Sequence, residues 1–155
     1  MNHLDSPVKI LSTFFGIGYL PLISGTYASI AGLLIFILIG NMTAGYVLVT
    51  ALVLGLGFAV CTKAERVFNQ KDSRRIVIDE VSGMLVALLF LPHDLKIAVL
   101  AFVIFRILDI TKPYPANKLE RLSGSLGVML DDIMAGIYTN IILQLVLRLT
   151  SFKVS

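Results

Sequence analysis

Two pairs of neighbouring carboxylates interrupt a chain that is otherwise rich in apolar residues. Asp79 and Glu80 occur in the stretch VIDEVSG, and Asp131 and Asp132 occur in VMLDDIMAG. The dipole of a helix stabilises an acidic residue in its first turn, which accounts for one residue of each pair. If the two pairs converge, their repulsion amounts to several kcal/mol unless a cation lies between them. Because Mg²⁺ prefers oxygen ligands and also accepts substrate phosphate, these four residues predict a magnesium site.

Basic residues near the acidic pairs are suited to holding a phosphate group. Arg106, Lys112 and Lys118 lie at or beyond the end of an apolar segment, and guanidinium and ammonium groups are common donors to phosphate. Arg106 and Asp109 are three residues apart, so on a helix they share a face and can form a local ion pair. The substrate of this site is therefore expected to be anionic and phosphorylated.

The stretch LISGTYAS, which precedes the first long apolar segment, offers a second way to bind an anion. Ser24, Gly25 and Thr26 would place backbone amides and hydroxyls at a helix start, where anions bind readily. The alternative is an ordinary Ser or Thr cap of that helix.

The composition indicates the elements that must position these residues. Of 155 residues, 57% are hydrophobic and 15% are charged, and the mean hydropathy of +0.89 is far above that of soluble proteins. We expect an all-α integral membrane protein, with residues 1–155 forming one domain of about five membrane-embedded helices. The segment from Val8 to Leu20 contains two glycines and is expected to be interfacial or re-entrant. The expected spans are residues 27–40, 44–61, 76–91, 95–111 and 128–149.

The charges divide unevenly between the two sides that these spans define. Residues 1–26, 62–75 and 112–127, with the helix ends that open onto them, carry ten of the thirteen basic residues. By the positive-inside rule this side is cytoplasmic. The same side carries nine of the ten acidic residues, which the rule does not explain. Ionisable residues at the edge of hydrocarbon are costly unless they are paired or functional, so the count predicts a polar site at the cytoplasmic interface.

Other chemistries fit the sequence less well. Cys61 is followed by Arg66 one position too early for a cysteine phosphatase motif, and His3 and His93 are far from the predicted site. Carboxylates within a membrane also mark ion pathways, which leaves a small cation transporter as an alternative. However, none of the expected spans has a charge near its midpoint, as a path through the membrane usually requires.

Four sequence blocks together resemble the bacterial phosphatidylglycerophosphatase A family. They are ISGT at residues 23–26, IDEVSGM at 78–84, FRILDITKPYP at 105–115 and GSLGVMLDDIMAGIY at 124–138. The resemblance runs from about residue 8 to residue 149 in the order of the family. Departures occur in the first block, where Ser24 stands in place of the usual proline and Ala28 in place of a frequent glycine.

The resemblance implies a magnesium-dependent enzyme of the bacterial inner membrane that hydrolyses phosphatidylglycerophosphate to phosphatidylglycerol and phosphate. The multi-pass chain would present its active site to the cytoplasm. Another lipid phosphate phosphatase is the alternative within the enzymes. The implied residues are Asp79, Asp109 and Asp131 for catalysis, Arg106, Lys112 and Thr26 for the substrate phosphate, and Asp79, Glu80, Asp131 and Asp132 for the metal.

Overall fold

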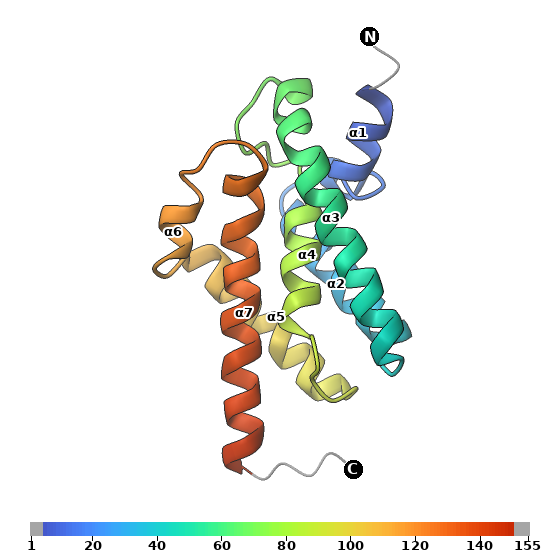
Figure 1. Ribbon diagram of the computed structural model, residues 1–155, viewed down its shortest axis with the longest axis vertical. Coiled ribbons are helices and arrows are strands. Elements are labelled where there is room, and N and C mark those ends of the chain that lie inside the picture. The colour runs from blue at the N-terminus through green and yellow to red at the C-terminus, as the bar shows by residue number, and fades with distance from the viewer. Residues whose placement is uncertain (1–4, 151–155) are drawn as a thin grey trace.

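A computed structural model describes residues 5–150 of the chain, in which every regular element is helical (Figure 1). The ends of the two terminal segments, residues 1–4 with His3 and residues 151–155, lie outside the described part. The all-α prediction is confirmed. The elements are α1 (Asp5–Ser12), a short 3-10 helix (Ile17–Tyr19), α2 (Ser24–Ile39), α3 (Thr43–Phe68), α4 (Ile78–Ala87), α5 (Leu95–Thr111), α6 (Ala116–Leu119) and α7 (Ser125–Thr150).

Among the described residues, α3 and α7 are the helices whose length and apolar composition suffice to cross a membrane. Each has 26 residues, which corresponds to about 39 Å against about 30 Å of hydrocarbon. The helices α2 and α5 are apolar but shorter, with 16 and 17 residues. The finding supports two candidate spans, whereas the sequence predicted about five embedded helices.

The third predicted span, residues 76–91, contains only the ten-residue helix α4. All residues of α4 except Glu80 are buried, because the helix is surrounded by the rest of the protein. An apolar stretch buried in protein and one facing lipid have the same composition, which is why the sequence pattern overestimated this helix. The chain then leaves the helix through Phe90, whose φ is 59°.

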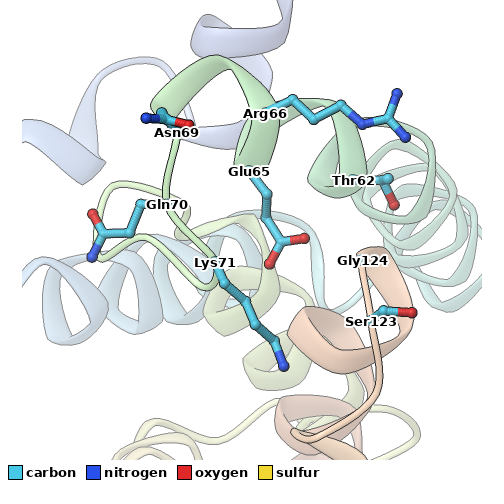
Figure 2. Close-up of a pocket in the computed structure, with 8 residues that line it drawn as sticks. All are labelled: Thr62, Glu65, Arg66, Asn69, Gln70, Lys71, Ser123 and Gly124. Atoms are coloured by element: carbon cyan, nitrogen blue, oxygen red, sulfur yellow. The ribbon is translucent and has the colours of Figure 1, made fainter.

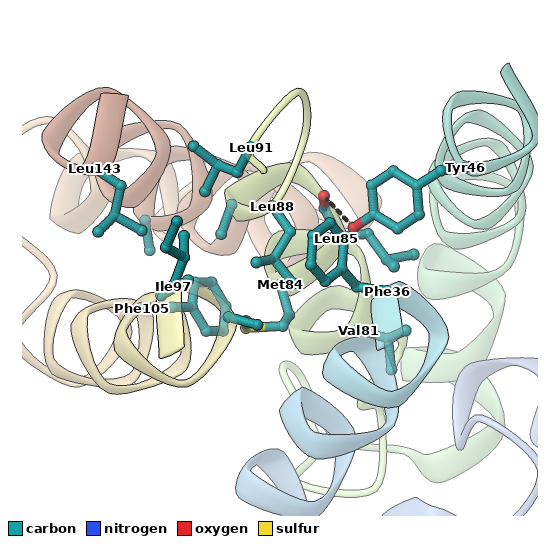
Figure 3. Packing of buried hydrophobic residues seen from close by; sticks show 14 of the residues in the cluster. Phe36, Tyr46, Val81, Met84, Leu85, Leu88, Leu91, Ile97, Phe105 and Leu143 are labelled. Carbon is teal, nitrogen blue, oxygen red and sulfur yellow. Dashed lines mark hydrogen bonds between the residues drawn. The ribbon is translucent and has the colours of Figure 1, made fainter. Parts of the chain in front are cut away.

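The core forms around α4, which packs mainly against α7 and α2. Met84 and Leu85 of α4 meet Phe36 of α2 and Phe105 of α5 in one cluster of buried side chains (Figure 3). The hydroxyl of Tyr46 donates a hydrogen bond of 2.9 Å to the carbonyl oxygen of Leu85. The carbonyls at the end of a helix lack partners within it, so this bond stabilises the end of α4.

Two glycines allow α4 and α7 to approach closely. A Cβ on Gly83 would lie 2.6 Å from the carbonyl oxygen of Asp132, and a Cβ on Gly136 would collide with the carbonyl oxygen of Gly83. Small residues are the usual means by which membrane helices pack backbone against backbone. Since Gly83 follows Asp79 by four residues and Gly136 follows Asp132 by four, the close contact lies one turn from the acidic residues.

The segment from Val8 to Leu20, expected to be interfacial or re-entrant, forms the end of α1, a turn and the 3-10 helix. Phe14 and Phe15 have φ values of 44° and 57°, which reverse the chain. The backbone amide of Val77 donates a hydrogen bond of 2.9 Å to the carbonyl oxygen of Ser12. The N-terminal segment is thereby attached to the residues just before α4.

Candidate active site

Three of the four predicted metal ligands lie together where α4 meets α7. Asp79 and Glu80 occupy the first turn of α4, as predicted, and Asp132 projects from α7. Their carboxylates offer one oxygen each, and these oxygens lie within 4.8 Å of one another. The convergence of the two acidic pairs, which the sequence pattern suggested from topology, is present in the structure.

The acidic cluster of Asp79, Glu80 and Asp132 is short of hydrogen-bond donors. Only 6% of Asp79 and 3% of Asp132 are exposed, and Asp79 Oδ1 and Glu80 Oε2 are buried with no partner in residues 5–150. Burying carboxylate oxygens without a donor or a cation is costly. The donor set consists of hard oxygen ligands and fits a divalent cation such as Mg²⁺ or Mn²⁺.

Asp131 has different surroundings from Asp132. Lys112 Nζ lies 2.7 Å from Asp131 Oδ2 and 3.1 Å from an oxygen of Glu120. Consecutive residues on a helix project about 100° apart, so Asp132 points to α4 while Asp131 points to the residue that follows α5. The other oxygen of Asp131, Oδ1, is buried and has no partner within the described chain.

The position of Asp131 and Asp132 in their helix differs from the prediction. Because α7 begins at Ser125, these residues lie in its second turn and not in its first. The favourable field of a helix start falls off within the first turn, so it does not explain the retention of this pair. The bond to Lys112 and the proximity of the α4 carboxylates are the relevant interactions.

Lys112 is a charged residue held in place by two acids. Partial burial acts against its charge, but the hydrogen bonds to Asp131 and Glu120 dominate and raise the pKa of Lys112 above its usual value. The ammonium group remains charged throughout the physiological range. It has three donors, and the two carboxylates use two of them.

Arg106 and Asp109 form the ion pair within α5 that their spacing predicted. The Nη1 atom of Arg106 also lies 3.5 Å from Ser29 Oγ in α2. A Cβ on Gly25 would lie 3.4 Å from the same Nη1 and would collide with an oxygen of Glu80. The start of α2 therefore borders the site through the backbone of Gly25.

Ser24 and Thr26 do not cap α2 with their side chains. The N-cap position is Ile23, which makes no side-chain cap, and Ser24 Oγ instead donates a hydrogen bond of 2.9 Å to the carbonyl oxygen of Arg74. Thr26 lies in the first turn of α2 and does not line the cavity beside the acids.

A cavity of about 150 Å³ joins the acidic and basic residues. The sequence analysis identified most of its lining, but it missed the contribution of the loop before α4. The cue to that loop in the sequence was its charge. The positive-inside rule already accounts for basic residues on that side, so the charge was not assigned to the site. The lining residues are Asp72, Ser73, Arg74, Ile76, Asp79, Glu80, Asp109, Lys112, Asp131 and Asp132.

Asp72 lies at the edge of this cavity. Its partial burial raises the pKa of the carboxyl, and the charge of Lys112 acts in the opposite direction. The backbone amide of Asp72 donates a hydrogen bond of 2.9 Å to Glu65. Its φ of 47° turns the chain from the end of α3 toward α4.

A second, larger cavity of about 580 Å³ adjoins the first across the Glu65–Asp72 contact (Figure 2). Its wall is formed by the end of α3, the loop after α3 and the residues just before α7. Glu65 and Lys71 are among the side chains that line it. It contains none of the three clustered acids. The lining residues are Thr62, Glu65, Arg66, Asn69, Gln70, Lys71, Ser123 and Gly124.

Comparison with known proteins gives consistent matches over most of the chain. The family model described as Phosphatidylglycerophosphatase A matches residues 10–147. A protein of that name from Escherichia coli is 35% identical over 137 residues, which cover 86% of this chain and 80% of the relative. A protein of the same name from Haemophilus influenzae is 32% identical over 143 residues, which cover 90% of this chain and 88% of the relative.

One relative has a name with a different head group. A Bacteroides thetaiotaomicron protein named as a candidate phosphatidylinositol-3-phosphatase is 34% identical over 143 residues, covering 86% of this chain and 89% of the relative. No solved structure matches the chain.

Proposed function

The chain belongs to the phosphatidylglycerophosphatase A family, and from this premise we propose that it removes the phosphate monoester of phosphatidylglycerophosphate. The products are phosphatidylglycerol and inorganic phosphate, so the protein is a phosphoric monoester hydrolase of phospholipid synthesis. The observation that carries the proposal is the buried acidic cluster of Asp79, Glu80 and Asp132, with unpartnered oxygens, beside the cations of the same cavity. Such a site suits a doubly charged phosphate and a divalent cation.

In this proposal Asp79, Glu80 and Asp132 would hold Mg²⁺, and Asp131, whose Oδ1 has no partner within residues 5–150, would contribute a fourth carboxylate. When bound, the cation would act as a Lewis acid that disperses negative charge on the phosphoryl oxygens. The three clustered carboxylates fit this role because a cation compensates the repulsion that burial imposes on them.

We propose that Lys112 and Arg106 bind the phosphate oxygens. Lys112 lines the cavity, whereas Arg106 is not part of the lining and borders the cavity through its pair with Asp109. Lys112 retains one donor beyond those taken by Asp131 and Glu120, and Arg106 has donors beyond the Nη1 group that faces Asp109. Both residues are held by their acidic partners before substrate arrives. Preorganised cations of this kind stabilise charge in a transition state without having to reorient.

Asp109 positions the attacking water. It lines the cavity and one of its oxygens is fixed by Arg106, which orients the carboxylate toward a water that approaches the phosphorus atom. The carboxylate accepts a proton from that water as the new P–O bond forms and the bond to the lipid oxygen breaks, and the departing oxygen takes up a proton from solvent to give the glycerol hydroxyl.

We place the protein in the bacterial inner membrane with this site at the cytoplasmic face. The positive-inside rule supports this orientation, and the many exposed apolar side chains of α2, α3, α5 and α7 support contact with lipid. The proposed arrangement has about five embedded helices in one domain. Of these, α4 extends across only part of the hydrocarbon layer.

A phosphatase with another lipid substrate is the second candidate, favoured by the name of the Bacteroides relative. One assay addresses both candidates. The protein is purified in detergent, and phosphate release is measured from phosphatidylglycerophosphate and from phosphatidylinositol 3-phosphate, with Mg²⁺ and with a chelator. We expect release from phosphatidylglycerophosphate to exceed the other by at least tenfold and to stop when the chelator is added.

Release that persists in the chelator would reject the metal site. A preference for the inositol lipid would replace the proposed substrate and leave the site intact. Restoring activity with Mg²⁺ after removal of the chelator is the control for irreversible unfolding.

A further inference from the structure

Arg74 is a basic residue of the catalytic cavity without an acidic partner. It lines the cavity with Asp79 and Lys112, and its side chain is exposed at the mouth. Within residues 5–150 it forms no ion pair, whereas Lys112 and Arg106 are both paired with carboxylates. Arg74 and Lys112 are the two basic residues of the lining. Of these two, Arg74 is the one whose guanidinium donors are not engaged by a carboxylate of residues 5–150 and can bind a ligand.

The backbone of Arg74 is fixed from a distant part of the chain. Ser24 Oγ donates a hydrogen bond of 2.9 Å to its carbonyl oxygen across 50 residues of sequence. The neighbouring arginine has another role, because the guanidinium of Arg75 lies 6.0 Å from the ring of Tyr19 and 5.6 Å from that of Phe68. These distances are typical of cation–π contacts. Two consecutive arginines thus differ: Arg75 lies against aromatic rings, and Arg74 is part of the lining of the cavity.

The residues around Ser24 connect an apolar surface to the acidic cluster. Leu22 is 95% exposed and Ile23 is 52% exposed, so both are suited to contact lipid. Ser24 then bonds to Arg74, and Gly25 lies against Glu80. The order along this path is apolar surface, Arg74 and acidic cluster.

The proposed substrate has its groups in the same order. Acyl chains are followed by a phosphodiester, a glycerol and the terminal phosphate monoester. The cavity of about 150 Å³ is well below the roughly 300–1,000 Å³ of pockets that enclose whole small molecules. It is suited to the terminal phosphate alone, which leaves the phosphodiester at the mouth beside Arg74.

We propose that Arg74 binds the phosphodiester of the lipid substrate and so selects lipids in which a phosphodiester separates the terminal phosphate from the diacylglycerol. This inference rests on the proposed function. A lipid such as phosphatidic acid, with its phosphate attached directly to diacylglycerol, has no group for Arg74 to bind. Guanidinium groups recognise phosphate oxygens through two parallel hydrogen bonds, which a lysine cannot reproduce.

The two products of the reaction can each be used as an inhibitor of lipid hydrolysis. Their inhibition constants report separately on binding of the phosphodiester and binding of the terminal phosphate. Phosphatidylglycerol carries the phosphodiester alone, and inorganic phosphate mimics the terminal group alone. In Arg74→Ala we expect the inhibition constant of phosphatidylglycerol to rise about 10- to 100-fold, as for a lost hydrogen-bonded charge. The inhibition constant of inorganic phosphate should stay within about twofold of the wild type. Arg74→Lys should give an intermediate value, and Arg121→Ala, which removes the same charge outside both cavities, should behave as the wild type.

An equal rise in both inhibition constants would assign Arg74 to the terminal phosphate and would overturn the proposal. The absence of a rise in either constant would also overturn it. Thermal unfolding of each variant verifies that it is folded, and Arg74→Gln replaces the alanine variant if that one is not. If the wild type does not cleave phosphatidylglycerophosphate, the proposed function fails separately. Direct binding of short-chain phosphatidylglycerol by calorimetry then tests Arg74 without turnover, with weaker binding by Arg74→Ala as the supporting result.

Discussion

Adjacent residues of the same type have different roles in this site. Asp132 joins Asp79 and Glu80, whereas Asp131 is bonded to Lys112. The sequence predicted that both aspartates belong to the site, but it could not separate them, because the direction of each side chain depends on the rotation of α7 about its axis. The same applies to Arg74 and Arg75, since a charged loop is expected on the cytoplasmic side whatever its individual residues do.

The separation of Asp131 and Asp132 gives opposite predictions for stability. Asp132→Asn removes one charge from a group of mutually repelling carboxylates, so without metal its midpoint of thermal unfolding should rise. Asp131→Asn removes the charged partner of Lys112, so the free energy of unfolding should fall by about 1–3 kcal/mol, as for a lost charged hydrogen bond, and the midpoint should fall with it. Thermal unfolding in detergent with a chelator measures both.

Addition of Mg²⁺ supplies the matched comparison for these two variants. A ligand that binds only the folded state raises its stability in proportion to the logarithm of its concentration above Kd. The midpoint of the wild type should rise most with Mg²⁺. That of Asp131→Asn should rise somewhat less, because the variant keeps an amide oxygen at this position, and that of Asp132→Asn should rise least, because Asp132 belongs to the clustered carboxylates. Equal responses of the two variants would argue against the assignment of Asp132 to the metal.

At the scale of elements, the site depends on how closely α4 and α7 approach. The sequence predicted α5 with the bounds that the structure shows; in the structure Asp94 caps its start and Pro113 follows its end. It placed the start of α7 three residues late and extended α4 beyond Ala87. Hydropathy does not distinguish a helix buried in protein from one in lipid, so the nature of α4 required the tertiary structure.

The close approach predicts that an alanine at Gly136 damages both stability and metal binding. Its Cβ would collide with the carbonyl oxygen of Gly83 and separate the two helices that carry the acids. Overpacking of this kind costs about 1–3 kcal/mol, and the affinity for Mg²⁺ should fall with it. Thermal unfolding with and without Mg²⁺ measures both effects.

Gly55 is the control, because it lies in α3 and a Cβ added to it would have no atom of a neighbouring element within 4 Å. Gly55→Ala should be neutral or stabilising by up to about 1 kcal/mol, since alanine favours helix more than glycine. If both alanine variants had the same stability and the same affinity for Mg²⁺, the close contact at Gly136 would not determine either property.

At the scale of the whole molecule, the polar groups gather at one end. The loop after α3 and the start of α7 lie at the same end of the molecule, and the turn between α2 and α3 lies at the other (Figure 1). This arrangement agrees with the alternation that the sequence predicted. The orientation that we propose rests on the distribution of charge and is open to direct measurement.

Single cysteines introduced at the two ends test this orientation. Cys61 is fully buried and is first replaced by alanine, after which Gln70→Cys and Met42→Cys are made separately. A maleimide that does not cross the inner membrane should label the residue-42 variant in intact cells with a permeabilised outer membrane. It should label the residue-70 variant only after the inner membrane is opened, and the reverse pattern would place the site outside the cytoplasm.

The shortness of α4 has a consequence for biosynthesis. At ten residues it is about 15 Å long, half the hydrocarbon thickness, so it cannot be anchored in the bilayer independently of its neighbours. Its principal neighbour α7 follows it in the chain and carries Asp132, so a chain that ends before α7 lacks both the support of α4 and the third carboxylate. The proposed metal site is therefore expected to form only after α7 has been made, and chains that end before α7 should be inactive and open to proteolysis.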